Sequence, residues 1–384
     1  MVAWLITNLI TWLVARGSVA GDGSEVAYWS TAGRHRWDSG HYLSIAETGY
    51  EMFWCRDRYE NFRDVMCGNV AWFPGYPMAV RAVSATGLSY EISAVVVTEA
   101  SLFGMFAVLW WLLGARLTWA TGLTLAIGTV FPGGIYLHAM FPIATGTLGL
   151  LVCIAGVKRG SGAIAAAGGF VAASCYPVGA VAVGMLLLSA FFAWQRDTWP
   201  IRFAKAGSSA AVAGCGVLWA KWLMWQATGH WDAYEIIQKS SYRQGDLRQP
   251  FEEMRKAYDF PFSDWYTPEG NLPWLVEHSL AAHRAQLWLN TAFVLLVLAT
   301  AAIQFLRNRR LDVEEWAALV LTVAIFLLPF FAGAAMSWYR NHAQMFAGLI
   351  LVRRMPRWIQ VSVLAVCTIQ YAFLGAMFFS GVLV

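Results

Sequence analysis

The sequence predicts an all-α protein that crosses a membrane many times. Of its 384 residues, 58% are hydrophobic and only 13% are charged, which is more apolar side chain than a soluble core of this size needs. The apolar runs recur along the whole chain, and helices can span a bilayer because they satisfy their own backbone hydrogen bonds. The net charge of +4 is small and gives no indication of nucleic-acid binding.

The apolar runs define the expected membrane spans. At 1.5 Å per residue, the first run covers only about two-thirds of a ~30 Å hydrocarbon core, so we extend it from Val2 through Val19. The alternative is a signal peptide, but tryptophans interrupt the run and no A-x-A cleavage site follows it. Tyr176-Pro177 divides a run too long for one helix, because proline interrupts helices. We expect about eleven spans, at 2–19, 92–113, 118–136, 141–157, 162–177, 179–194, 206–226, 286–306, 316–336, 340–352 and 358–380.

The basic residues indicate which side each connection faces. If the N-terminus is cytoplasmic and 71–90 is a short membrane-dipping element, every Lys and Arg of the short connections falls inside, as the positive-inside rule requires. A full span at 71–90 would reverse all later segments and break the rule. Two large polar loops, 17–90 and 227–285, then face outwards. The cytoplasmic basic residues would be Arg116, Lys158, Arg159, Arg196, Arg202, Lys205, Arg307, Arg309, Arg310, Arg353, Arg354 and Arg357.

We therefore expect a multi-pass cell-membrane protein, with a single transmembrane domain over 1–384, whose chemistry is extracytoplasmic. Arg outnumbers Lys and the C-terminal residues contain no ER-retrieval tetrapeptide, which favours a bacterial plasma membrane. In an oxidising compartment, Cys55 and Cys67 of the first loop are expected to form a disulfide. The alternative is two free thiols.

Two stretches of the first loop combine an acid with aromatic and polar side chains. We interpret them as one active-site loop on the outer face of the membrane. The alternative is an interfacial loop with aromatic anchors, because Trp and Tyr are common at that depth. The first stretch is Arg36-Trp37-Asp38-Ser39-Gly40-His41-Tyr42, continuing through Ile45-Ala46-Glu47-Thr48-Gly49-Tyr50, and the second is Ala71-Trp72-Phe73-Pro74-Gly75-Tyr76-Pro77.

These stretches resemble the PIG-V family, which are mannosyltransferases of the multi-pass GT-C class. The resemblance is specific over residues 36–81 and weak afterwards. It implies a GT-C fold, a polyprenyl-phosphate-mannose donor, inversion at the sugar carbon and a catalytic role for Asp38. It does not identify the acceptor, which we expect to be a lipid, a glycan or a protein outside the cytoplasm.

Sugar transfer needs a base that takes the proton of the acceptor hydroxyl. Asp38 is the candidate base, and a compatible alternative is that it caps the following helix. Trp37, His41 and Tyr42 are candidates for binding the donor, since side chains three or four residues apart share a helix face. A satisfied interfacial histidine is the alternative for His41. Glu47 is a further candidate, with a scaffold acid at the helix end as the simpler interpretation.

The leaving phosphate needs positive charge, and arginine can hold its oxygens in a bidentate manner. Arg340, close to His342, is the first choice, and Arg284 and Arg81 are others. The alternative is that these are interfacial cations facing lipid head groups. Within the second span, Glu99 is an intramembrane acid and therefore a candidate for function. Lys221 is expected to be its partner or a phosphate ligand.

Neither a metal nor another cofactor is expected, since the acids Asp22 and Glu25 lack the Asp-x-Asp spacing. The expected partners are the lipid-linked donor, the acceptor and membrane lipids. Two other classes stay open: a transporter or flippase of a lipid-linked sugar, and an assembly subunit whose loops bind partners. Replacing Asp38 with Asn separates them, because only a transferase requires the carboxylate.

Overall fold

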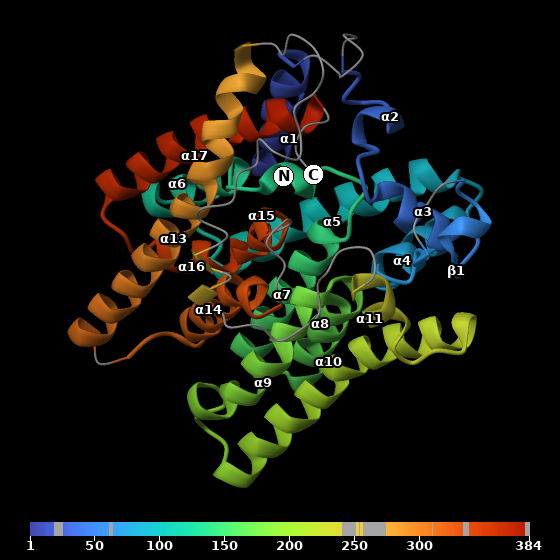
Figure 1. Cartoon of the computed structure of the whole chain (residues 1–384). Coiled ribbons are helices and arrows are strands. Elements are labelled where there is room, and N and C mark those ends of the chain that lie inside the picture. The colour runs from blue at the N-terminus through green and yellow to red at the C-terminus, as the bar shows by residue number, and fades with distance from the viewer. Residues whose placement is uncertain are drawn as a thin grey trace.

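In the computed structural model, the described residues are mostly helical, and one short hairpin lies among them (Figure 1). The structure describes residues 1–18, 26–60, 64–239, 251–252, 254–255, 274–308, 310–332 and 338–380; side chains are not described for 274–284, 332 and 338–339. Most of the predicted outer loop 227–285 thus lies outside the described residues.

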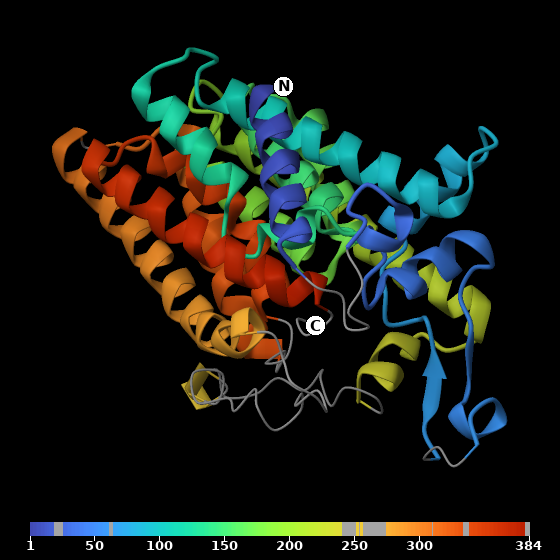
Figure 2. The ribbon, with the colours of Figure 1, turned by 90° about the horizontal axis from the view of Figure 1, so that it is seen from above.

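The helices form a bundle, with α13 and α17 in contact along one side (Figure 2). The helical elements are α1 (Val2–Arg16), α2 (Thr31–Arg34), α3 (Ser39–Glu47), η1 (Cys55–Asp57), α4 (Gly75–Ser84), α5 (Tyr90–Leu112), α6 (Trp119–Thr129), η2 (Gly134–Leu137), α7 (Ile143–Lys158), α8 (Gly162–Cys175), η3 (Pro177–Ala180), α9 (Val181–Phe192), α10 (Trp199–Thr228), α11 (Ala233–Ile237), α13 (Trp274–Asn308), α14 (Val313–Ala332), α15 (Trp338–His342), η6 (Ala343–Gly348), α16 (Leu349–Val352) and α17 (Arg357–Phe379).

Four helices in the described ranges are long and apolar enough to cross a membrane, judged by length and composition: 90–112, 285–308, 313–331 and 357–379. Four further apolar helices are shorter, and they lie where spans are predicted: Val2–Arg16, Ile143–Lys158, Gly162–Cys175 and Pro177–Phe192. The chain is therefore a helical membrane protein, but the number of about eleven spans is not confirmed.

Two predicted spans are interrupted. The α-helix expected over 118–136 ends at Thr129, and Pro132 and Gly133 follow, with φ 75° at the glycine. Proline cannot donate a backbone hydrogen bond and a left-handed residue ends a helix, so the sequence itself accounts for the break. The segment expected over 340–352 consists of α15, η6 and α16 instead of one regular helix.

Close packing of α7 against α8 depends on glycine. A Cβ at Gly156 would lie 2.2 Å from the backbone nitrogen of Ala165, and one at Gly168 would lie 2.4 Å from that of Cys153. Small residues are the usual means by which membrane helices approach each other. Helix α8 ends at Cys175, and the residues at this end lie against Gly75 of the first loop.

The basic connections gather at one end of the bundle. Lys158 ends α7 and pairs with Glu314 in the first turn of α14 at 2.8 Å. Arg354, just before α17, pairs with Asp312 at 2.8 Å and Glu315 at 2.6 Å. Three of the connections that the positive-inside rule assigns to the cytoplasm thus meet through ion pairs. The orientation across the membrane stays a prediction.

The first loop folds into a small layer beside the opposite end of the bundle. It contains α2, α3, α4 and an antiparallel hairpin of β1 (Met52–Trp54) and β2 (Met66–Gly68). In Figure 1, α3, α4 and β1 lie together near α11. Helix α4 has ten residues, about 15 Å at 1.5 Å per residue, which is about half of a ~30 Å hydrocarbon core. The membrane-dipping role of 71–90 stays a prediction.

The expected disulfide joins Cys55 to Cys67 across the end of the hairpin. Closing a loop of this size removes about 3 kcal/mol of unfolded-state entropy. We expect Cys55→Ser to leave the bundle folded but to make the hairpin cleavable, measured by limited proteolysis of the purified protein. Reductant should likewise make the hairpin of the wild type cleavable and should not change the cleavage of the variant. Equal cleavage of reduced and oxidised wild type would contradict the prediction.

Candidate active site

An ion pair joins two distant parts of the chain beside the first loop. Nη1 of Arg340 donates to Oδ2 of Asp38, which lies 302 positions earlier in the sequence. Their side chains are 10% and 25% exposed, and partial shielding from water strengthens the attraction. The candidate base and the first candidate for phosphate binding are therefore neighbours.

The backbone around Asp38 directs its side chain away from its own helix. Asp38 occupies the N-cap position of α3, yet its side chain makes no capping hydrogen bond. The preceding Trp37 has φ 44°, which is unfavourable for a bulky residue. Such strain clusters at functional sites. The interpretation of Asp38 as a simple side-chain cap therefore does not describe this structure.

Two tyrosines from separate segments lie near the ion pair, and a third lies near those two. Tyr42 on α3 and Tyr176 at the end of α8 are close enough to interact electrostatically with both Asp38 and Arg340, and Tyr234 on α11 is close to the other two tyrosines. Burial, followed by Tyr176 and Asp38, raises the pKa of Tyr42 well above 10.0. Its hydroxyl stays protonated and can donate a hydrogen bond.

A buried histidine two residues after Arg340 anchors this part of the chain to neighbouring helices. His342 is fully buried, with Nε2 3.1 Å from the carbonyl of Phe326 and Nδ1 2.9 Å from Nδ2 of Asn290. A carbonyl only accepts, so we assign the proton to Nε2. With both nitrogens used, His342 positions the turn and is not available to a phosphate. Nε2 of Gln286 in turn donates to Oδ1 of Asn290 at 3.1 Å, and Nε2 of Gln370 donates to Oε1 of Gln286 at 3.0 Å.

The second aromatic stretch supports the first. The rings of Trp72 and His41 are stacked, with centroids 3.6 Å apart and planes 16° apart. A Cβ at Gly75 would lie 2.6 Å from Oγ of Ser174, so only glycine lets α4 approach the end of α8 this closely. The stretch therefore positions α3 and Tyr176 and contributes no reactive group of its own.

The stacked His41 gives the loop a pH dependence. Burial lowers the pKa of His41 below its ordinary 6.5, and Asp38 partly opposes this. The unfolded chain therefore binds more protons than the folded one between the two pKa values, so the free energy of unfolding falls as pH drops below about 6.5. We expect thermal unfolding in detergent to show this loss, and His41→Phe to reduce it. An unchanged slope in the variant would contradict the assignment.

Two of the candidate residues lie away from the pair. Arg81 donates to the carbonyls of Ala46 at 2.6 Å and Ile45 at 3.1 Å, which fixes the last turn of α3. Glu47 is the last residue of α3 and is exposed, roughly 13 Å along the helix from Asp38. Arg81 thus stabilises the end of α3, and neither Arg81 nor Glu47 lies beside the ion pair of Asp38 and Arg340.

The intramembrane acid has a different partner from the one expected. Glu99 forms an ion pair with Arg34, not with Lys221. It also accepts from Nε1 of Trp4 at 2.7 Å and from Asn8 at 3.1 Å. Arg34 belongs to the first loop, so this buried pair fastens that loop to α1 and α5.

Lys221 pairs with Glu235 and lies 5.4 Å from the ring centroid of Tyr234. It thereby holds α11 beside the site. Arg284 lies on α13, but its side chain is outside the described residues. Across the described ranges, no group of three or more His, Cys, Asp or Glu is placed to hold a metal ion, and the absence of a cofactor stays a prediction.

Comparison with known proteins gives a limited result. No family model matches the chain, and no curated protein matches it. The chain is similar to the Archaeoglobus fulgidus oligosaccharyltransferase in two crystal structures. The first, tethered to an acceptor peptide with the NVT sequon through a disulfide bond, has a TM-score of 0.48 and 12% identity, covering 99% of this chain and 55% of that one.

The second crystal structure, a complex with Zn and sulfate, has a TM-score of 0.47 and 12% identity, covering 99% of this chain and 53% of that one. The chain spans about half the length of the structures it matches. Likenesses at these TM-scores carry no inference about activity or substrate.

Proposed function

We propose that the protein is a membrane glycosyltransferase that moves mannose from polyprenyl-phosphate-mannose to an extracytoplasmic acceptor. The contact between Asp38 and Arg340 carries the proposal. A transfer of this kind needs a base for the acceptor proton and a cation for the leaving phosphate, and the chain brings two such groups together from distant parts of its sequence.

The reaction is a single displacement. The acceptor oxygen forms a bond to the anomeric carbon while the bond from that carbon to the phosphate oxygen breaks. The bonding electron pair leaves with the polyprenyl phosphate, and the acceptor proton passes to the carboxylate of Asp38. Arg340 stabilises the negative charge that grows on the phosphate. The resemblance to PIG-V mannosyltransferases supports this mechanism and the identity of the sugar.

The ion pair also suggests how binding of the donor would free the carboxylate of Asp38 to act as the base. In the structure, Asp38 accepts a hydrogen bond from the guanidinium of Arg340. A bound phosphate would compete for the same guanidinium, because arginine binds phosphate oxygens strongly. The Asp38 carboxylate would then be released toward the acceptor hydroxyl. The hydroxyls of Tyr42 and Tyr176, both near the pair, can hydrogen-bond the sugar.

The test supplies labelled polyprenyl-phosphate-mannose to membranes that contain the protein. Label should move into a lipid or polymer fraction, and the labelled product identifies the acceptor class. If label enters no acceptor and the purified protein binds no donor, the proposal fails. If label crosses the bilayer on its original lipid without transfer, the protein is a transporter of the lipid-linked sugar.

A further inference from the structure

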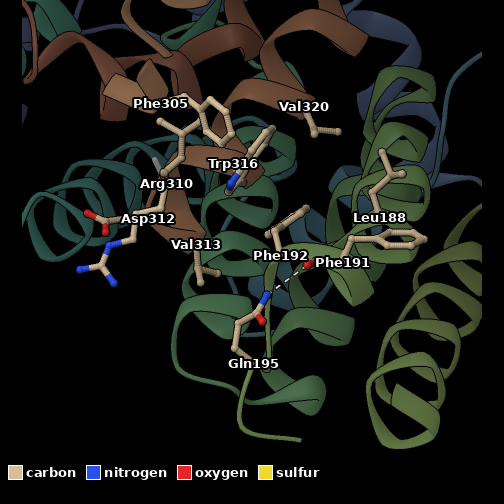
Figure 3. A pocket seen from close by; sticks show the side chains of 11 residues that line it. Leu188, Phe191, Phe192, Gln195, Phe305, Arg310, Asp312, Val313, Trp316 and Val320 are labelled. Atoms are coloured by element: carbon tan, nitrogen blue, oxygen red, sulfur yellow. Dashed lines mark hydrogen bonds between the residues drawn. The ribbon is translucent and has the colours of Figure 1, made fainter. Parts of the chain in front are cut away.

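A hollow lies at the opposite end of the bundle from the ion pair of Asp38. It has a volume of about 690 Å³ and opens between α9 and the connection from α13 to α14 (Figure 3). The same end holds the ion pairs of Lys158 and Arg354, which the positive-inside pattern places in the cytoplasm. The hollow is therefore independent of the proposed transfer reaction.

Aromatic side chains form the walls of this hollow. Trp316 stacks against Phe192 with ring centroids 6.2 Å apart and meets the edge of Phe305 at 6.4 Å. The outer parts of the walls are open, since Phe191 is 57% exposed and Leu188 is 47% exposed. Apolar surface of this kind is covered most favourably by hydrocarbon.

A cation, Arg310, lines the solvent-exposed rim of the hollow. Arg310 is exposed, and within the described part of the chain it has no ion pair. Its neighbour on the rim, Asp312, is paired with Arg354 at 2.8 Å. The acid is thus neutralised from within the protein, and the charge presented by the rim is positive. A single negative charge above an apolar body complements this arrangement.

We propose that this hollow binds an anionic phospholipid of the cytoplasmic leaflet. Its phosphate group pairs with Arg310, and its acyl chains lie along Phe191, Phe305 and Trp316. Free phosphate fits the rim but leaves the aromatic walls in contact with water, whereas a neutral lipid covers the walls but leaves the cation unpaired. Only an anionic lipid satisfies both parts of the hollow.

The test uses the full-length protein in nanodiscs of phosphatidylcholine, with or without phosphatidylglycerol. After gentle extraction into detergent, native mass spectrometry counts the phosphatidylglycerol retained by wild type, Arg310→Gln and Arg116→Gln. Arg116 is an exposed arginine of the α5–α6 connection at the same end of the bundle and does not line the hollow. It is therefore the matched control for surface charge.

We expect Arg310→Gln to lower phosphatidylglycerol affinity about fivefold, the effect of one surface cation on an anionic lipid, and Arg116→Gln to leave it unchanged. Val320→Trp, which fills the hollow, should reduce retention of both lipids. Equal retention by wild type and Arg310→Gln would overturn the proposal. So would equal losses in the two arginine variants, which would indicate attraction to the surface in general. Suppression of phosphatidylglycerol retention by inorganic phosphate alone would also overturn it, in favour of a soluble anion.

Discussion

Asp38→Asn is expected to lower the rate of mannose transfer by about two to four orders of magnitude, which is the usual contribution of a positioned general base. Asparagine has nearly the same shape and can still accept a hydrogen bond from Arg340, but it cannot take the acceptor proton. Donor binding should therefore survive while turnover is lost. Initial rates with labelled donor, at equal amounts of membrane protein, measure the effect.

The control is Glu47→Gln, which neutralises an exposed acid on the same helix and should leave the rate unchanged. If both variants were as active as wild type, Asp38 would have no catalytic role, and the ion pair with Arg340 would be structural. If Asp38→Asn lost donor binding as well as turnover, the carboxylate would act in binding and another residue would be the base.

The sequence predicts the helices well because their signals are local. Basic residues mark the end of α7, at Lys158, and the approach to α14, at Arg310, and the ion pair between Lys158 and Glu314 shows that these two ends meet. The signals that end a helix are also local. Pro132 and Gly133 end the helix expected over 118–136, although the apolar run continues past them. Hydropathy averages over several residues, so it does not register a single left-handed glycine.

The site was predictable only in part, because its partners are distant in sequence. The motif around Asp38 indicates the acid, but nothing in the sequence shows that Arg34, and not Lys221, pairs with Glu99. Such pairing depends on how α2, α5 and α10 pack. The same limit applies to the tyrosines: Tyr176 has a local signal only as the residue before a helix-breaking proline, and Tyr234 as one aromatic residue in a loop rich in them.

Arg340→Gln is expected to lower kcat/KM for the donor by about 10²–10³, the usual effect of removing one group that stabilises developing charge. The loss should appear mainly in kcat, because negative charge on the phosphate grows as the bond breaks, with a smaller rise in KM for the donor. Arg340→Lys should recover part of the activity, since it restores the charge without the bidentate geometry. Arg58→Gln, which removes an exposed cation of the first loop, is the control and should have no effect.

A variant of the buried His342 tests whether the position of Arg340 matters as well as its charge. His342→Leu removes no net charge at neutral pH if His342 is neutral as assigned, but it breaks the hydrogen bonds to Asn290 and Phe326 that hold the turn. It should lower kcat in the wild type and have little further effect in Arg340→Gln, because both changes act through one guanidinium. Additive losses in the double variant would show that His342 supports the fold alone. An Arg340→Gln enzyme with normal kcat would place the leaving phosphate elsewhere in the outer loops.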